Sequence, residues 1–458
     1  MDAASAGQPA GLSDQEPQEP SKDDLAAQAH QVALARQRRL NTLARRHRWV
    51  WSPDGVLQRQ KTILLRLPAG AKLEGPGMAP LGGADAFAHA YIEIDDAMDR
   101  DKFQAALTDG RTLAGAPALP LTLIEPLAAS AGFTETGPVT WGVKAVGALN
   151  SPFTGAGVTV AVLDTGIDVD HPAFHGVSVV PKNFTGAGSD DDVADTRGHG
   201  THCAGTIFGR DVDGLRIGVA PGVTSALIGK VLGHGPSAGS SDKLCEAIMW
   251  AVNNGANVIS MSLGIDFPGW VKDLVEIEGL NIQVATSLAL EQYRANIRVF
   301  EWVSGLVSSR ADVGAQAAII VAASGNESAR DATPSYAINV APPAASVGFV
   351  AVGALGQAPG GLRVASFSNT RATVAAPGVD VVSAQCGTPT CSAKSGTSMA
   401  TPHVAGVAAL WAEQLAGEGH LDPSALRTML VASATLKGLA PRTSRLDVGR
   451  GLVKAPPR

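Results

Sequence analysis

The sequence has few cysteines, no long apolar run and no excess of positive charge. Four cysteines are too few to form a disulfide scaffold in a chain of 458 residues, although Cys386 and Cys391 bracket a short loop and could pair if oxidised. No stretch of eighteen consecutive apolar residues occurs, so we expect no membrane span. The net charge of −6 gives no reason to expect nucleic acid as a partner.

The beginning of the chain also lacks the apolar core of a secretion signal. Residues 1–24 are rich in acids, Pro, Gly and Ser, a composition typical of disorder. Residues 25–48 carry six arginines and no acid on a helix-favouring background, and no apolar stretch follows them. We therefore expect residues 1–57 to form a disordered and basic helical arm, either solvated or docked on an anionic surface. The same absence predicts a cytoplasmic location with reduced thiols.

A serine-containing segment at residues 395–406 places the Ser398 hydroxyl ahead of an alanine-rich apolar stretch. A helix beginning there would leave unpaired N–H groups and a positive dipole end beside that hydroxyl. Both can stabilise negative charge that develops near it. Taken alone, such a turn is more often structural, so its meaning depends on the rest of the chain.

Two upstream segments carry matching chemistry. Residues 160–163 are apolar and predict a buried strand, and Asp164 stands at its carboxyl end, where open α/β sheets place functional groups. His199 lies between two glycines before a second helix-like stretch. Asp164 could instead close an Asx turn. His199 and His202 have the spacing of metal ligands on a helix, but no further ligand lies nearby in the sequence, so we expect no metal there.

In chain order these segments supply a carboxylate, an imidazole and a hydroxyl, from Asp164, His199 and Ser398. This order and the motifs around it resemble the subtilisin-like serine protease (subtilase) family. Further matching segments are residues 218–221, 260–264 and 322–326, and the resemblance extends over residues 139–453. It implies an α/β, three-layer fold with a mainly parallel central sheet. The implied activity is that of a serine endopeptidase working through an acyl-enzyme intermediate. A narrow-specificity maturation protease that cleaves a leader peptide or a partner protein is the alternative, and a catalytically inert binding protein is a third reading.

The resemblance also implies roles for four residues. Ser398 would be the nucleophile, His199 the general base and then acid, and Asp164 the group that orients the imidazole. Asn326 follows an apolar strand, and its side-chain amide would donate to the oxyanion together with the backbone N–H of Ser398. Elsewhere an Asn after Gly is usually a turn residue.

Peptide or protein substrates would lie as an added strand between two backbone edges. By resemblance, the substrate-binding residues are Gly235, Gly239, Ser262, Leu263 and Gly264, with Ala322, Ala323 and Glu327 at the mouth of the specificity pocket. Glu327 could favour a basic residue before the cleaved bond.

We expect no cofactor. Ala173 replaces a family calcium ligand, and Arg210, Val212 and Arg216 stand where further oxygen donors are usual, so the resemblance predicts that this calcium site is absent. Asp211 and Asp213 in the same loop leave that site open as an alternative, and Asp190, Asp191 and Asp192 could hold a different ion or form a solvated acidic loop.

A segment before the implied catalytic domain has the pattern of a small α+β unit. Its elements are expected at residues 61–67, 88–94, 99–107 and 121–124, the third being a helix and the others strands. Residues 58–130 would then be a propeptide-like domain that assists folding and inhibits the active site, or else an accessory domain. We expect self-cleavage between Glu125 and Gly137, and a catalytic domain over residues 131–458. Residues 265–316 would add a helical insertion that covers the core, narrows the cleft or binds a partner.

Overall fold

The computed structural model describes residues 50–51, 57–73, 80–81, 83–233, 239–311, 314 and 316–458. Residues 1–46 and 47–458 separate into two units, and the fold below belongs to the second. The predicted arm over residues 1–57 therefore lies almost entirely outside the described residues.

The central sheet has eight strands in the order β10-β11-β9-β13-β15-β16-β17, with β18 also paired to β16. All pairs are parallel except β16 with β17. The strands are β9 (Thr159–Asp164), β10 (Ser178–Asn183), β11 (Ser225–Lys230), β13 (Val258–Met261), β15 (Ile319–Ala323), β16 (Val350–Gly356), β17 (Arg363–Val364) and β18 (Val374–Pro377).

Alternate side chains of each central strand enter the cores on the two faces of this sheet. In β9, Val160 and Val162 join one buried cluster, whereas Ala161 and Leu163 join the other. Strands buried on both faces read as continuous apolar runs, which explains why residues 160–163 show no alternation with polar residues. Helices cover both faces, so the predicted three-layer α/β fold is confirmed.

The helices of this part are α4 (Trp141–Val146), α5 (His199–Phe208), α6 (Ser241–Asn253), α7 (Phe267–Glu276), α8 (Ile282–Arg310), α9 (Thr397–Gly417), α10 (Pro423–Ala432) and α11 (Arg445–Val448), with short 3₁₀ turns η1 (Ala148–Asn150) and η2 (Pro172–Phe174). Helices α5 and α9 pack on one face of the sheet, and α6 and α8 on the other. None of the helices in the described part combines the length and apolarity that a membrane crossing requires.

A second, antiparallel sheet precedes the central one. Its strands are β1 (Val50–Trp51), β2 (Leu57–Arg66), β5 (Tyr91–Asp99) and β6 (Thr112–Pro117), with β2 between β5 and β6. Helices α2 (Gly83–Ala88) and α3 (Arg100–Thr108) and the short pair β3 (Lys72–Leu73) and β4 (Pro80–Leu81) accompany it. The strand expected over residues 88–94 instead begins at Tyr91, because α2 runs to Ala88 and a turn from Phe87 to Ala90 follows.

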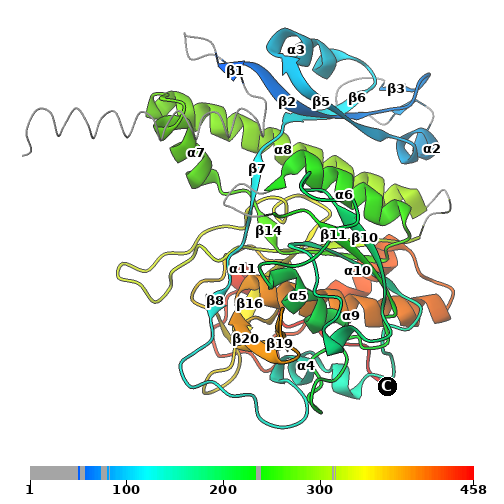
Figure 1. The fold of residues 1–458 in the computed structure, drawn as a ribbon, viewed down its shortest axis with the longest axis vertical. Helices are drawn as coiled ribbons and strands as arrows, with labels where there is room; N and C mark the ends of the chain where they lie inside the picture. The colour runs from blue at the N-terminus through cyan, green and yellow to red at the C-terminus, as the bar shows by residue number, and fades with distance from the viewer. Residues whose placement is uncertain are drawn as a thin grey trace, which may run out of the picture. The chain divides into compact units, whose positions relative to one another are not determined.

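The insertion at residues 265–316 forms α7 and α8, and α8 packs against β2 and β6 (Figure 1). One face of α8 contributes Val299, Val303 and Leu306 to the buried clusters, and the aromatic ring of Trp302 meets that of Phe87 edge-on at 5.5 Å. The antiparallel sheet thus shares part of its buried apolar surface with the part that contains the central sheet, through α8 of the predicted insertion.

Short strands complete the fold beside the central sheet. They are β7 (Pro120–Leu123), β8 (Leu127–Ala128), β12 (Gly239–Ser240), β14 (Leu263–Gly264), β19 (Val381–Ala384) and β20 (Cys391–Ser395). Strand β7 lies between β12 and β14, and β8 pairs with β20. One continuous segment therefore runs from the N-terminal antiparallel sheet, past the central sheet, to the pair formed by β19 and β20 (Figure 1).

Candidate active site

Asp164 and His199 come together because β9 ends at the point where α5 begins. His199 Nδ1 donates to Asp164 Oδ1 at 2.7 Å, and both side chains are buried. The backbone N–H of Thr165 donates to the same carboxylate oxygen at 2.8 Å. Gly200 allows the close approach, since a Cβ there would lie 2.1 Å from the carbonyl oxygen of Gly166. Because the carboxylate accepts from Nδ1, it leaves Nε2 as the basic nitrogen of the neutral ring.

Ser398 lies in the first turn of α9, after Gly396, and is fully buried. The thiol of Cys203 links the two helices: Cys203 Sγ is 3.5 Å from the carbonyl oxygen of Ser398 and 3.8 Å from His199 Nδ1. His199 Nε2 has no hydrogen-bond partner among the described residues. The Ser398 hydroxyl does not donate to it here, because it donates instead to the carbonyl oxygen of Ile124 at 3.0 Å.

The side-chain amide of Asn326 has a fixed orientation. Its Oδ1 accepts from the backbone N–H of Thr397 at 2.9 Å and from the Thr397 hydroxyl at 2.8 Å. Since both of these groups donate, the amide nitrogen must face the opposite way, toward the cleft. There Nδ2 donates to the carbonyl oxygen of Glu125 at 3.0 Å.

The occupant of the cleft is the chain itself. Residues 120–128, called the strap from here on, run along both expected substrate edges. In β7, Leu121 pairs with Gly239 of β12, and Leu123 and Thr122 pair with Leu263 and Gly264 of β14. Beyond the nucleophile, β8 of the strap pairs with β20. This is β-strand addition by an extended peptide, the binding mode expected for a substrate.

Ser398 and Asn326 contact two successive carbonyl groups of the strap. Ser398 holds that of Ile124, and Asn326 holds that of Glu125. Attack on a peptide bond requires the hydroxyl at one carbonyl carbon and the amide at the oxygen of that same group. The strap therefore lies in the cleft in a register that does not present a single bond to both groups.

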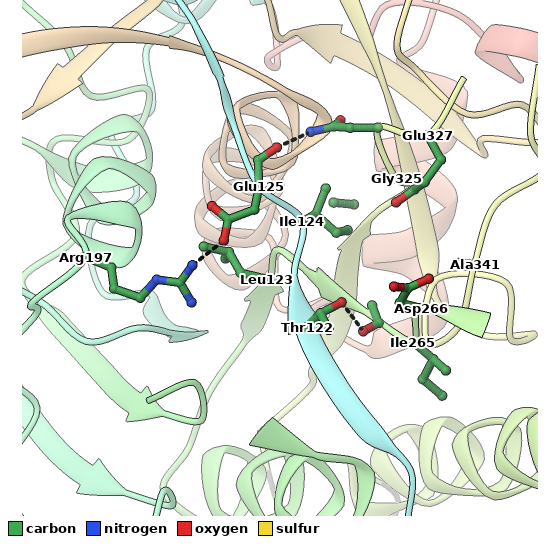
Figure 2. Close-up of a pocket in the computed structure, with 13 residues that line it drawn as sticks. Thr122, Leu123, Ile124, Glu125, Arg197, Ile265, Asp266, Gly325, Glu327 and Ala341 are labelled. Carbon is green, nitrogen blue, oxygen red and sulfur yellow. Dashed lines mark hydrogen bonds and ion pairs between the residues drawn. The ribbon is translucent and has the colours of Figure 1, made fainter. Parts of the chain in front are cut away.

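A cavity of about 690 Å³ adjoins the strap at this point (Figure 2). Its lining includes Gly264, Ala323 and Glu327 of the residues expected to bind substrate, together with Asn326, the expected oxyanion donor. Ala322 is fully buried in the core behind it and does not line it. Glu327 accepts from Asn369 Nδ2 at 2.5 Å, so its carboxylate already has a neutral partner within the protein.

The remaining predicted substrate residues divide into two groups. Ser262 is buried, and its hydroxyl donates to the carbonyl oxygen of Ser398 at 3.3 Å, so its side chain supports the turn that carries Ser398. Gly239, Leu263 and Gly264 present backbone to the strap. Gly235 lies outside the described residues.

Electrostatics at the site favour an imidazole that binds a proton readily. Burial acts to lower the pKa of His199, but the Asp164 carboxylate outweighs it and raises the pKa above 6.5. Burial raises the pKa of the Cys203 thiol, which therefore stays protonated at neutral pH.

One group of possible metal ligands exists among the described His, Cys, Asp and Glu side chains. The ligand atoms of Asp164, His199 and Cys203 lie within 4.8 Å of one another. The set fits a metal poorly, because Asp164 already accepts from His199 and Cys203 is a protonated thiol. His202 does not add to it, since its Nε2 faces the carbonyl oxygens of Val381 and Ser392 at 3.1 Å each.

Sequence reasoning missed a charged pair at the edge of the cavity. The Arg197 guanidinium donates to the Glu125 carboxylate at the cavity's edge (Figure 2). No local motif marks this pair, because 72 positions separate its members. Its only sequence signal is the place of Arg197, two residues before His199.

Comparison with known proteins agrees with this geometry. The model of the subtilase family matches residues 155–451. M-protease of Shouchella clausii is 38% identical over 280 residues, which are 59% of this chain and 59% of that protein. Subtilisin Savinase of Lederbergia lenta is 38% identical over 280 residues, which are 59% of this chain and 83% of that protein. The chain belongs to the subtilase family.

A solved structure resembles this chain in fold over a longer part of the chain. Fervidolysin from Fervidobacterium pennivorans, a keratinolytic enzyme related to subtilisin, superposes with a TM-score of 0.58 at 21% identity. The match covers 88% of this chain and 61% of fervidolysin, so it reaches beyond the part that aligns with M-protease and Savinase.

The comparisons contradict the cytoplasmic location expected from the sequence. M-protease and subtilisin Savinase are secreted extracellular subtilisins, and nothing positively shows this chain to be intracellular. The expectation rested on the absence of an apolar signal core near Met1, which was too weak a ground for it.

Proposed function

We propose that the chain is a serine endopeptidase. Ser398 is the nucleophile, His199 the base, Asp164 the group that orients it, and Asn326 the side-chain donor to the oxyanion. The observation that carries the proposal is the buried Asp164–His199 hydrogen bond, linked through Cys203 to a serine at a helix start whose hydroxyl already contacts an extended peptide.

The reaction follows from this arrangement. When a substrate carbonyl replaces that of Ile124, the Ser398 hydroxyl is free to turn toward His199 Nε2, which now lacks a partner. Oγ attacks the carbonyl carbon while Nε2 takes its proton, and the oxyanion accepts from Asn326 Nδ2. The protonated imidazole then gives its proton to the leaving amine as the C–N bond breaks. Water enters, and the same base activates it to hydrolyse the acyl-enzyme.

The position of the strap supports the hypothesis that residues 58–130 are an inhibitory propeptide. The strap covers the nucleophile and both backbone edges, so a substrate must displace it. We propose that this N-terminal segment acts as an inhibitor. A maturation protease with few substrates is the second candidate, favoured by the same restricted access.

Changing Ser398 to Ala tests the proposal. The variant should keep the fold, because the side chain loses one hydroxyl, while hydrolysis of casein and labelling by a fluorophosphonate probe should both disappear. Ser392→Ala, in β20, is the matched control and should still be labelled. Hydrolysis that persists in Ser398→Ala at the wild-type rate would remove the proposed nucleophile.

A further inference from the structure

The strap is held in the cleft mainly through its backbone, and such contacts are tolerant of sequence. The pairs with β12, β14 and β20 and the two carbonyl contacts at Ser398 and Asn326 are all of this kind. Among the described side chains of the strap, Glu125 makes the one ion pair with the catalytic part, to Arg197. Because backbone contacts do not distinguish side chains, this one charged contact is where the cleft can select among substrate side chains.

Arg197 is held rigidly at its backbone. The N–H groups of Arg197 and Gly198 donate to the buried carboxylate of Asp195 at 3.0 and 2.8 Å. Asp195 also accepts from the hydroxyls of Thr165 and Thr201 at 2.9 and 2.7 Å. Burial alone would raise the pKa of Asp195, but these hydrogen bonds hold it below its ordinary value, so the anchor stays charged.

The same loop leads directly into α5 and His199. The backbone of Arg197 is therefore fixed close to the imidazole, and the Arg197 side chain, which is 25% exposed, reaches the cleft from this fixed point. The planar guanidinium of Arg197 presents paired N–H donors whose spacing matches the two oxygens of a carboxylate.

Apart from Glu125, the other charged side chains that line the cavity have the opposite sign to Arg197. Glu327 and Asp266 line the cavity, where the Ile124 side chain lies 3.7 Å from the place of a Cβ on Gly264. Glu327 accepts from Asn369, and Asp266 caps α7 by accepting from the N–H of Gly269 at 2.9 Å. Among the described lining residues Arg197 is the one cation in a cavity that otherwise holds carboxylates, and it favours an acid at the position of Glu125, which it contacts.

We propose that Arg197 is a specificity-determining residue that selects substrates with an acidic side chain directly after an apolar one, and that Glu125 imitates this acid within the chain. The proposal rests on the proposed peptidase function. When the strap leaves, the guanidinium loses the Glu125 carboxylate, and a substrate carboxylate restores the pair.

Three internally quenched peptides test it on the full-length protein. They share one sequence and differ only in carrying Glu, Gln or Lys directly after an Ile. The wild type should hydrolyse the Glu peptide about tenfold faster in kcat/KM than the Lys peptide, because a charge-assisted pair is gained in one and repulsion in the other. Arg197→Gln should remove the preference and Arg197→Glu should reverse it. Arg363→Glu, an exposed change of equal charge in β17, is the control and should keep the wild-type order.

A second readout does not depend on peptide turnover. The rate at which a fluorophosphonate labels Ser398 reports how firmly the strap covers it. Glu125→Lys should speed labelling severalfold, and the exchange Glu125→Lys with Arg197→Glu should restore the slow rate. The proposal is overturned if the labelling rate is the same in the wild type, in Glu125→Lys and in the double variant. It is also overturned if Arg197→Glu still prefers the Glu peptide. If no variant is labelled at all, the peptidase function itself fails.

Discussion

The imidazole of His199 can act as a base only in its neutral form, so its pKa sets the acidic limit of activity. The Asp164 carboxylate raises that pKa above 6.5, which keeps the ring protonated to higher pH. We expect kcat/KM to rise with pH through a midpoint above 6.5 and to be lost as pH falls through it. A pH–rate profile on a neutral peptide measures this.

The comparison variant is Asp164→Asn. Its midpoint should move down, because the charge that raises the imidazole pKa is gone, and its plateau should fall by about 10⁴, as in the corresponding change of a chymotrypsin-type triad. A wild-type rate that declined steadily from about pH 5 to pH 8 would contradict a histidine base.

At the scale of single residues, the sequence located the site residues that lie in short motifs, and it did not reveal contacts between residues far apart in the chain. Asp164, His199, Asn326 and Ser398 each sit in a short motif at the end of a strand or the start of a helix, so each could be located without coordinates. The contact between Arg197 and Glu125 depends on how the strap is threaded, which no local pattern encodes.

At the scale of elements, the site depends on how closely α5 approaches the end of β9. A Cβ on Gly200 would lie 2.1 Å from the carbonyl oxygen of Gly166 and 3.2 Å from Asp164 Cβ. Gly200→Ala should therefore push the helix off the strand, lengthen the Asp164–His199 hydrogen bond and lower kcat. It should also cost about 1–3 kcal/mol of stability through overpacking.

Gly417, in the last turn of α9, provides the matched control. A Cβ there meets nothing within 4 Å, so Gly417→Ala should leave kcat unchanged and alter stability by less than about 1 kcal/mol. Thermal melts and steady-state rates on both variants check the pair. Equal effects of the two changes would show that the close approach at Gly200 does not matter.

The loop after α5 carries a second element-scale prediction. Arg210 donates to the carbonyl oxygens of Phe208 and Val223 at 2.8 and 2.9 Å, and Arg216 to those of Gly218 and Val219 at 3.3 Å each. Cationic side chains thus hold the oxygens that could otherwise bind a hard cation. We expect the melting temperature to change by no more than about 2 °C when excess EDTA is added. A fall of many degrees would reveal a structural calcium ion.

The elements of the N-terminal sheet show what sequence patterns could and could not predict. The helix expected over residues 99–107 is found one residue later, as α3, because Asp99 caps it by accepting from the N–H of Lys102. The strand expected at residues 88–94 was displaced by α2, since a short alanine-rich run suits a helix as well as a strand. The packing of α8 against β2 and β6 is a tertiary contact that periodicity cannot specify.

At the scale of the whole described chain, the N-terminal antiparallel sheet and the part that contains the central sheet share a buried cluster. Ile63 of β2 and Ala116 of β6 belong to the same cluster as Phe300 of α8. Lys61 of β2 pairs with the fully buried carboxylate of Asp242 in α6 at 2.5 Å. A catalytic part made without residues 58–130 would expose this apolar surface and leave Asp242 without its cation, a costly state when the group stays buried.

We therefore predict that a fragment starting at Pro138 refolds slowly or in low yield on its own. Its parallel sheet is built from contacts between distant segments, which form slowly without a template. Residues 58–130 added in trans should raise the yield, and they should inhibit the folded fragment, because the strap up to Ala128 then occupies both substrate edges. Refolding yield by circular dichroism and inhibition of peptide hydrolysis are the two measurements.

Self-digestion must be separated from misfolding in that experiment. The same fragment carrying Ser398→Ala cannot digest itself, so a low yield that persists in it reports folding alone. In the wild-type full-length chain, mass spectrometry should find cleavage between Glu125 and Gly137, and Ser398→Ala should remain intact. Since Ser398 and Asn326 hold successive carbonyls, cleavage requires the strap to shift by one residue, and it should be slow. A fragment that refolds readily alone, together with an added segment that neither helps nor inhibits, would make residues 58–130 an accessory domain rather than a propeptide-like one.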